Sequence, residues 1–325
     1  MINKDLEKIV ETSDEWIRTR TGIEKRHITS EKSTADMAAE AAKKAIEMAK
    51  ISAEDVDLII TATLSGDYHT PSTACLVQAK IGAKNAVCFD LNAACSGFLF
   101  SMNTAVNYMQ TGMSKIALII GAETLSKLVD WTDRTSCILF GDGAGAAILS
   151  WNLEESNNNL QSLEKSELGN LASGSKKYSA VLHSDGTRAK ALTCEEEVLL
   201  NPFVKLEREA NKIQMDGQAI FKFAVKNVPV CINEVLEKVD IPKEEIKYFI
   251  LHQANERIIQ SISRKLKLPI ERFPMNLAEC GNTSSASIPI LLDELNRNGM
   301  LERGDKLVLS GFGGGLTWGA AYLEW

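Results

Sequence analysis

GAGAAILSW (residues 143–151) ends one series of apolar, β-branched segments, and GLTWGAAYLEW (residues 315–325) ends a second series of the same kind. Each series holds three expected strands, at 56–62, 116–121 and 145–150 in the first and at 247–251, 306–310 and 319–323 in the second. Segments with helical periodicity lie between them, for example at 34–49 and 96–109. Alternating strands and helices indicate an α/β fold, and the matched order of the two series predicts an internal duplication.

The duplication implies two halves of one topology. We expect them at residues 1–160 and 161–325, related by a pseudo-twofold axis. Between the two series of strands lies the segment 152–177, which is rich in Asn, Ser, Glu and Lys. That composition predicts a surface linker.

The composition is typical of a globular protein and excludes several classes. Of 325 residues, 45% are hydrophobic and 24% charged, and no apolar run approaches the roughly 18 residues of a membrane span. The charged N-terminal stretch lacks the apolar core of a secretory signal, so we expect a cytoplasmic protein with no membrane association. A net charge of −7 argues against nucleic acid as the main partner.

One cysteine is a candidate nucleophile. Seven cysteines are scattered through the chain without a C-x-x-C pair, which predicts reduced thiols and neither a disulfide framework nor a metal site. Cys95, in NAACSGFLF (92–100), follows an expected strand at 86–91 and opens a helix, whose N-terminus favours a thiolate and an oxyanion. A buried inert thiol is the commoner role of a free cysteine, and the pattern alone leaves both readings open.

The repeat relates Cys95 to an asparagine of the second half. Cys95 lies 17 residues before Gly112, and Asn282 lies 17 residues before Gly299, where each glycine ends a helix-like segment. Counting from these glycines without gaps, we expect Cys95 and Asn282 to occupy matching places at the N-termini of two related helices. Across a pseudo-twofold axis the two helix ends would face a shared site.

Four histidines supply few candidate bases. His252 follows the expected strand 247–251, and ligands gather at the carboxyl ends of strands in α/β sheets, although a histidine packed in the core or a loop is as common. His27 and His69 lie among polar loop residues and are expected to face solvent, and His183 ends a strand before a turn.

Two glycine-rich segments are not phosphate loops. GDGAGA (141–146) and GFGGG (311–315) match neither G-x-x-x-x-G-K-[ST] nor a dinucleotide fingerprint. Their glycines are expected to allow close approach of the backbone to another segment or a ligand, and an N–H group in GFGGG is a candidate oxyanion donor.

Together, several motifs resemble the β-ketoacyl-acyl carrier protein synthase III family: NAACSGF at Cys95, HQAN at His252, GNTSSAS at Asn282 and the final GFGGGLTWG. The likeness covers nearly the whole chain, including TSDEWIRTRTGIEKRHI and FGDGAGAAIL. It implies a thiolase-like fold of two duplicated α/β/α halves, each with a five-stranded mixed sheet. The family's first strand, with the pattern I-x-G-x-G-x-x-x-P, has no match, so we expect the N-terminal half to lack that edge strand and to expose the strand at 145–150.

The resemblance implies a role for each catalytic candidate. Cys95 would attack an acyl-CoA thioester and form an acyl-enzyme, which splits one hard transfer into two easier ones. Malonyl-acyl carrier protein would then lose carbon dioxide, with His252 and Asn282 donating hydrogen bonds to its thioester oxygen. The Cys95 and Gly314 N–H groups would hold the acyl oxyanion, and Phe312 would pack against the nucleophile. No metal or redox cofactor is required.

Binding residues carry over in the same way. Trp16 and Arg134 would sandwich the CoA adenine, while Gly217 and Asn255 would line the pantetheine tunnel. The acyl carrier protein would dock at the run Gln253, Ala254, Asn255, Glu256 and Arg257. Arg264, Lys265 and Lys267 lie close by in sequence, so this acidic protein would have a basic face for an acidic partner.

The resemblance also implies a homodimer. Thr70, before Pro71, would reach into the partner subunit's acyl pocket, and its small side chain would admit longer or branched primers than an aromatic residue allows.

Other readings remain open. One is a Cys-His-Asn condensing enzyme that primes a secondary-metabolite pathway, and another is a non-catalytic partner subunit. The elongating synthases use a second histidine where this chain has Asn282, plant-type polyketide synthases end in GFGPG, and the papain signature C-G-[SA]-C-[WY] is not present.

Overall fold

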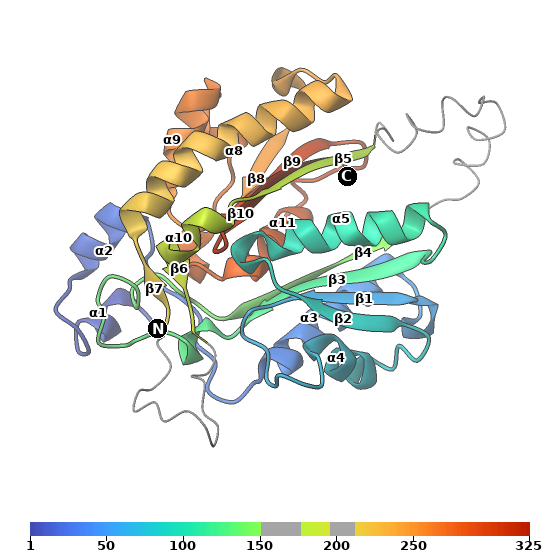
Figure 1. Ribbon diagram of the computed structural model, residues 1–325, viewed down its shortest axis with the longest axis horizontal. Coiled ribbons are helices and arrows are strands. Elements are labelled where there is room, and N and C mark those ends of the chain that lie inside the picture. Colours follow the sequence, from blue (N-terminus) through green and yellow to red (C-terminus); the bar gives the residue numbers. More distant parts are fainter. Residues whose placement is uncertain (151–176, 196–211) are drawn as a thin grey trace.

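The computed structural model describes residues 1–150, 177–195 and 212–325. These residues form alternating layers of helices and sheets, with two sheets that each have helices on both faces (Figure 1). The expected linker falls almost wholly within 151–176, outside the described residues.

The N-terminal sheet has the strand order β2-β1-β3-β4. Its strands are β1 (Leu58–Ala62), β2 (Val87–Leu91), β3 (Ile116–Glu123) and β4 (Gly143–Ser150). β1 runs parallel to β2 and β3, while β4 pairs antiparallel with β3. All five residues of β1 are buried, because a central strand covered on both faces needs apolar side chains in both directions.

The C-terminal sheet has the strand order β5-β10-β9-β8. Its strands are β5 (Tyr178–Ser184), β8 (Tyr248–Leu251), β9 (Lys306–Gly313) and β10 (Thr317–Glu324). β8 is parallel to β9, and β10 is antiparallel to both of its neighbours. A separate two-stranded ladder joins β6 (Leu192–Thr193) to β7 (Gln214–Met215).

Helices form the remaining layers. They are α1 (Asn3–Leu6), α2 (Asp14–Thr21), α3 (Thr34–Ala49), α4 (Thr73–Ile81), α5 (Gly97–Gln110), α8 (Gly217–Val239), α9 (Glu256–Leu266), α10 (Leu277–Cys280) and α11 (Ser287–Arg297). In Figure 1, α3 and α4 cover the outer face of the N-terminal sheet, α8 and α9 that of the C-terminal sheet, and α5 and α11 lie between the sheets. Among the described helices, none is long and apolar enough to traverse a lipid bilayer.

These elements confirm the expected α/β duplication. Each of the six strands predicted from the repeat is present, and the helix expected at 34–49 is α3 with those bounds. A capping box starts that helix, in which the Ser33 hydroxyl accepts from the Asp36 N–H and the Asp36 carboxylate accepts from the Ser33 N–H. β4 is an edge strand, as expected.

Within the described residues, the N-terminal sheet has four strands, as expected for a half that lacks its first edge strand. The described C-terminal sheet also has four strands, one fewer than expected. In the C-terminal half, the segment after α9 corresponds to the place of β2 but does not join β8. This segment contains Pro274, and proline has no N–H group to donate to a strand ladder.

The duplication has a precise offset. Leu58 pairs with Ala117 in the first half and Tyr248 with Leu307 in the second, so both partners are displaced by 190 positions. The short 3-10 turns before α5 and α11, η2 (Ala94–Ser96) and η7 (Ser284–Ala286), obey the same offset. Each turn begins with a residue of positive φ, 45° at Ala94 and 49° at Ser284.

This offset corrects the expected match of Cys95 with Asn282. The structural counterpart of Cys95 is Ser285, because both are the second residue of their turn. Counting back from the terminal glycines fails since α5 has 14 residues and α11 only 11. The expectation that the two helix ends face each other is nevertheless met, because η2 and η7 pack together.

A glycine in β3 allows this approach. A Cβ atom on Gly121 would lie 2.3 Å from the carbonyl oxygen of Ser285, and on its counterpart Gly311 it would lie 3.5 Å from that of Cys95. A side chain at position 121 would push η7 away from β3, whereas position 311 leaves room for a methyl group.

Gly121→Ala should lower the free energy of unfolding by about 3 kcal/mol, because the added methyl group meets backbone that cannot rotate away. Gly186→Ala is the matched control, since a Cβ atom there meets open space, and it should stay within about 0.5 kcal/mol of the parent protein. Urea denaturation of the three proteins measures the difference, and equal stabilities would contradict the tight contact at Gly121.

Candidate active site

Cys95 lies at the junction of both halves. It sits in η2 between β2 and α5, and only 7% of its surface is exposed. The end of β9 covers it, because a Cβ atom on Gly313 would lie 2.6 Å from the Cys95 nitrogen. The backbone of Cys95 in the N-terminal half therefore packs directly against a strand of the C-terminal half.

Burial decides the protonation of this thiol. It raises the pKa of Cys95 to about 12, and the nearby Ser284 hydroxyl acts in the opposite direction. The N-terminus of α5, which follows directly, adds partial positive charge that favours a thiolate. The sulfur has to release a proton before it can act as a nucleophile.

His252 follows β8 and is 2% exposed. Its backbone N–H donates to the Ser310 carbonyl at 2.8 Å, and its ring packs edge-on against Phe312 with centroids 5.4 Å apart. Burial lowers the pKa of His252 to about 3, so the imidazole is neutral.

Ser287 controls the tautomer of this imidazole. Its hydroxyl lies 2.7 Å from His252 Nδ1 and 2.9 Å from the Ser284 carbonyl oxygen, and it has a single proton for the two contacts. When that proton points to Nδ1, the Nε2 atom carries the ring proton and becomes a hydrogen-bond donor. When it points to the Ser284 carbonyl, Nδ1 carries the ring proton and donates to Ser287.

Asn282 is fixed by its backbone and by its own side-chain oxygen. Its N–H donates to Leu139 and its carbonyl accepts from Gly141, which makes a bridge on either side of Phe140. The side-chain oxygen accepts from the Ser284 N–H at 2.9 Å. This leaves the amide NH₂ group as the part of the side chain that donates.

The structure brings the three predicted residues together around the segment Asn282–Ser287. Ser284 contributes to the environment of Cys95 and donates to Asn282, while Ser287 contacts His252. Sequence reasoning missed both serines as functional residues. The signal was available in GNTSSAS, where small hydroxyl residues follow Asn282 and open a helix.

The remaining pocket residues lie in different places. Gly314 belongs to the same corner, because a Cβ atom on it would lie 3.3 Å from the Leu192 carbonyl and 3.7 Å from Ala94 Cβ. Phe312 contacts the His252 ring. Thr70 is exposed on the loop between β1 and α4, and the structure does not bring its side chain into the group around Ser284.

Trp16 and Arg134 are in contact with each other. The Arg134 guanidinium is 5.3 Å from the Trp16 ring centroid, and Arg20, which sequence reasoning missed, is at 4.8 Å. Asn255 joins this group, since its side-chain amide donates to the Arg20 carbonyl at 3.0 Å. Gly217, the first residue of α8, follows Asp216, which caps the helix.

The run expected to dock a partner divides into buried and exposed residues. Gln253 is 1% exposed and uses its amide internally, donating to Leu251 and accepting from the Asn276 N–H, so its side chain is not a surface contact. Ala254, Asn255 and Glu256 are half-buried. The exposed basic side chains of α9 and its C-terminal end are Arg257, Arg264, Lys265 and Lys267.

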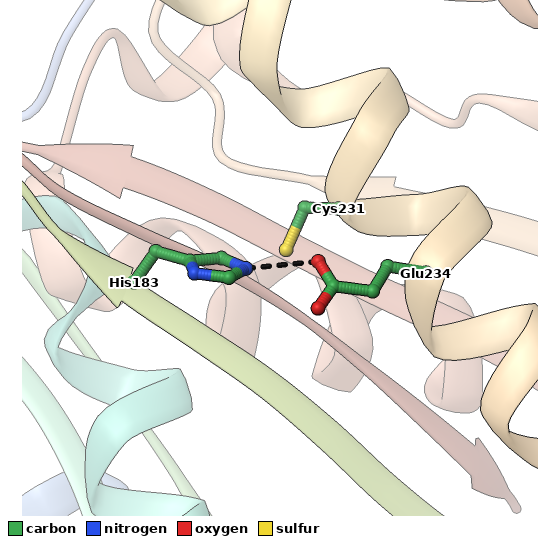
Figure 2. Close-up of side chains that lie close together, drawn as sticks. All are labelled: His183, Cys231 and Glu234. Atoms are coloured by element: carbon green, nitrogen blue, oxygen red, sulfur yellow. Dashed lines mark hydrogen bonds and ion pairs between the residues drawn. The ribbon is translucent and has the colours of Figure 1, made fainter.

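Figure 2 shows the group of metal-ligand residue types that the described residues bring together, His183, Cys231 and Glu234. His183 Nε2 and the Glu234 carboxylate form a hydrogen bond of 2.9 Å, and the Cys231 thiol lies next to them. Burial raises the pKa of Cys231 to about 12.

Cavity size does not mark the site. A groove of about 980 Å³ runs along β4 between α3 and α11, and its lining includes none of Cys95, His252 and Asn282. The site is recognised by the convergence of reactive side chains.

Comparison with protein families identifies two matching regions. Residues 89–169 match the model of 3-oxoacyl-[acyl-carrier-protein] synthase III, and residues 236–325 match the model of its C-terminal part. Both regions contribute to the convergence at Cys95.

Individual relatives are similar over the full length. The chain is 48% identical to "Beta-ketoacyl-[acyl-carrier-protein] synthase III" of Clostridium acetobutylicum, over 99% of this chain and 94% of that protein. It is 45% identical to the protein of that name in Streptococcus mutans, with the same coverage. The crystal structure of 3-oxoacyl-[acyl-carrier-protein] synthase III from Aquifex aeolicus superposes with a TM-score of 0.87 at 41% identity, over 100% of this chain and 95% of that one.

The buried, neutral His252 predicts a dependence of stability on pH. Below pH 6.5 the unfolded imidazole takes up a proton that the folded one does not, so stability falls as the pH falls. From pH 7 to pH 5, the free energy of unfolding of the parent protein should drop by about 2 kcal/mol more than that of His252→Gln. Urea denaturation at both pH values tests this, and equal drops would show that the folded imidazole titrates normally.

Proposed function

The chain belongs to the 3-oxoacyl-[acyl-carrier-protein] synthase III family, and we propose that it condenses an acyl-CoA primer with malonyl-acyl carrier protein, the first condensation of fatty acid synthesis. The observation that carries this proposal is the convergence of Cys95, His252 and Asn282 on the segment 282–287. The thiolase-like α/β fold of its structural relatives agrees with the duplicated architecture of the chain.

In the first half-reaction Cys95 is the nucleophile. Its sulfur forms a bond to the acyl carbonyl carbon, the carbon–sulfur bond to CoA breaks, and the proton of the thiol leaves with the CoA sulfur. The oxyanion formed on the way is stabilised by the Cys95 and Gly314 N–H groups. Packing of Gly313 on the Cys95 backbone supports this role, because it holds η2 and the end of β9 at a fixed separation.

In the second half-reaction His252 and Asn282 are hydrogen-bond donors. The malonyl carboxyl leaves as carbon dioxide, and the electron pair moves into an enolate whose oxygen both side chains stabilise. The enolate carbon then bonds to the acyl carbonyl, and the Cys95 sulfur leaves. The imidazole is neutral, and it fits this task when Ser287 donates to Nδ1 and leaves the ring proton on Nε2. The Asn282 amide, whose oxygen is already engaged, keeps its NH₂ group for donation.

Substrate binding is proposed at two surfaces. Trp16 and Arg134, with Arg20, offer a stacking and cation–π site for the adenine of CoA, and Asn255 and Gly217 would contact the pantetheine arm. The exposed arginines and lysines of α9 would attract an acidic acyl carrier protein to the same side. The chemistry as proposed requires no metal or redox cofactor.

We also propose how the chain divides into two halves and how two chains assemble. We place the halves at 1–160 and 161–325, since the first sheet ends at Ser150 and the second begins at Tyr178. We propose a homodimer in which Thr70, exposed on its loop, reaches the partner's acyl pocket. We also propose that the protein acts in the reducing cytoplasm, where the Cys95 thiol stays reduced.

Incubation with acetyl-CoA should add one acetyl group to the intact protein. Cys95→Ser should not acquire this group, because a serine hydroxyl attacks the thioester far more slowly than a thiolate. Intact-protein mass spectrometry measures the adduct. Isobutyryl- and hexanoyl-CoA in parallel test the breadth of primers that Thr70 is expected to permit. A folded parent protein that acquires no adduct from any of the three would favour a non-catalytic role.

Charge reversal on the basic face should weaken the carrier-protein step alone. In the double variant Arg257→Glu/Arg264→Glu, KM for malonyl-acyl carrier protein should rise about tenfold while acetyl-adduct formation from acetyl-CoA keeps its rate. Lys84→Glu, at a side chain that is 78% exposed on the other half, is the control. Equal KM values for all three proteins would exclude docking at α9.

A further inference from the structure

Glu123 is a fully buried carboxyl group that the reaction described above does not use. It ends β3, has 0% of its surface exposed and makes no ion pair with any described lysine, arginine or histidine. Burying an unpaired carboxylate costs free energy of folding, so hydrogen bonds or protonation must offset that cost.

One carboxyl oxygen is surrounded by donors. Glu123 Oε2 accepts from the Leu64 N–H at 3.1 Å and from the Ser65 hydroxyl at 2.5 Å. The Thr63 hydroxyl adds a third contact at 3.3 Å. Ser65 and Thr63 are free to donate here, because each accepts a backbone N–H with its own oxygen.

The contacts of the other carboxyl oxygen favour a proton on that oxygen. Glu123 Oε1 lies 2.9 Å from the Ser285 hydroxyl, which also lies 2.8 Å from the Ala62 carbonyl oxygen. A carbonyl only accepts, and Ser285 has one proton, so donation to Ala62 leaves nothing to donate to Glu123. A protonated Oε1 that donates to Ser285 satisfies every group. Burial also raises the pKa of Glu123, which agrees with this assignment.

The pseudo-twofold offset explains where this acid sits. Cys95, His252 and Gly313 have Ser285, Ala62 and Glu123 as counterparts. Where Gly313 leaves the Cys95 backbone uncovered by a side chain, the side chain of Glu123 reaches the hydroxyl of Ser285. Glu123 thus fills the place that would be a second active site if the halves were identical.

This filled place adjoins the real one. Ser284, next to Ser285, has its hydroxyl buried without a well-formed hydrogen bond, and it lies close enough to influence both Cys95 and Glu123. Its N–H holds the Asn282 side chain. A hydrogen bond that holds Ser285 in place therefore also holds the neighbouring Ser284, which contacts Cys95 and Asn282.

We propose that Glu123 is a positioning residue, held as a neutral carboxylic acid, that closes the pseudo-symmetric site and anchors the Asn282–Ser285 turn against Cys95 without placing a negative charge beside the reacting sulfur. The positioning role rests on the proposed function. The protonation state does not.

Alkylation of Cys95 by iodoacetamide between pH 7 and 9 tests the protonation state without any acyl-CoA. Glu123→Gln removes an ionisable group and keeps the shape, so the Cys95 rate constant should stay within threefold of the parent protein. If Glu123 were ionised, its removal would lower the thiol pKa by about one unit and accelerate alkylation about tenfold. That acceleration would overturn the proposal. Cys95→Ser in each background identifies the Cys95 signal.

Steady-state kinetics test the positioning role. Glu123→Ala should lower kcat at least tenfold with little change in KM for acetyl-CoA, because the Trp16 site is untouched, and Glu123→Gln should restore most of kcat. A kcat for Glu123→Ala within twofold of the parent protein would overturn the role. Should Glu123→Ala fail to fold, the alkylation result for Glu123→Gln still decides the protonation state of Glu123. A parent protein that alkylates at Cys95 but accepts no acyl group would instead refute the proposed function.

Discussion

The contact between the turns η2 and η7 at the pseudo-twofold axis is the constraint on which the site depends. Each turn carries a non-glycine residue at positive φ, and each packs under a strand glycine of the opposite half. Cys95 comes from one turn, while Ser284 of the other orients Asn282. Backbone packed this closely moves only at high cost, so nucleophile and donor keep their separation while substrates exchange.

The two halves share one backbone arrangement, and the reactive groups lie at positions where their side chains differ. The same strand end bears a glycine over Cys95 and a glutamate over Ser285, and the same strand exit bears His252 in one half and Ala62 in the other. A fold with two equivalent places therefore has a reactive thiol in one and a buried acid in the other. Glu123 contacts Ser285 and His252 contacts Ser287, so the segment 284–287 links the buried acid to the reactive residues.

Burial gives this site neutral groups in place of an ion pair. It raises the pKa of the Cys95 thiol and lowers that of the His252 imidazole, so both favour their uncharged forms. Catalysis then depends on preorganised donors and on the N-terminus of α5 for the charge that develops on substrate oxygens. Ser287 and Asn282 matter because their hydrogen bonds decide which atoms remain free to donate.

The sequence alone predicted the α/β class and the six strands of the repeat, because periodicity is a local property. Its short motifs also picked out Cys95, His252 and Asn282, which the structure brings together around one segment. It misassigned the counterpart of Cys95, since the unequal lengths of α5 and α11 leave no trace in an ungapped count. Gln253 was expected at the surface, and only packing shows that its amide is consumed inside. Ser284, Ser287 and Glu123 gain their roles from contacts across the pseudo-twofold axis, which tertiary structure creates by joining segments remote in the chain.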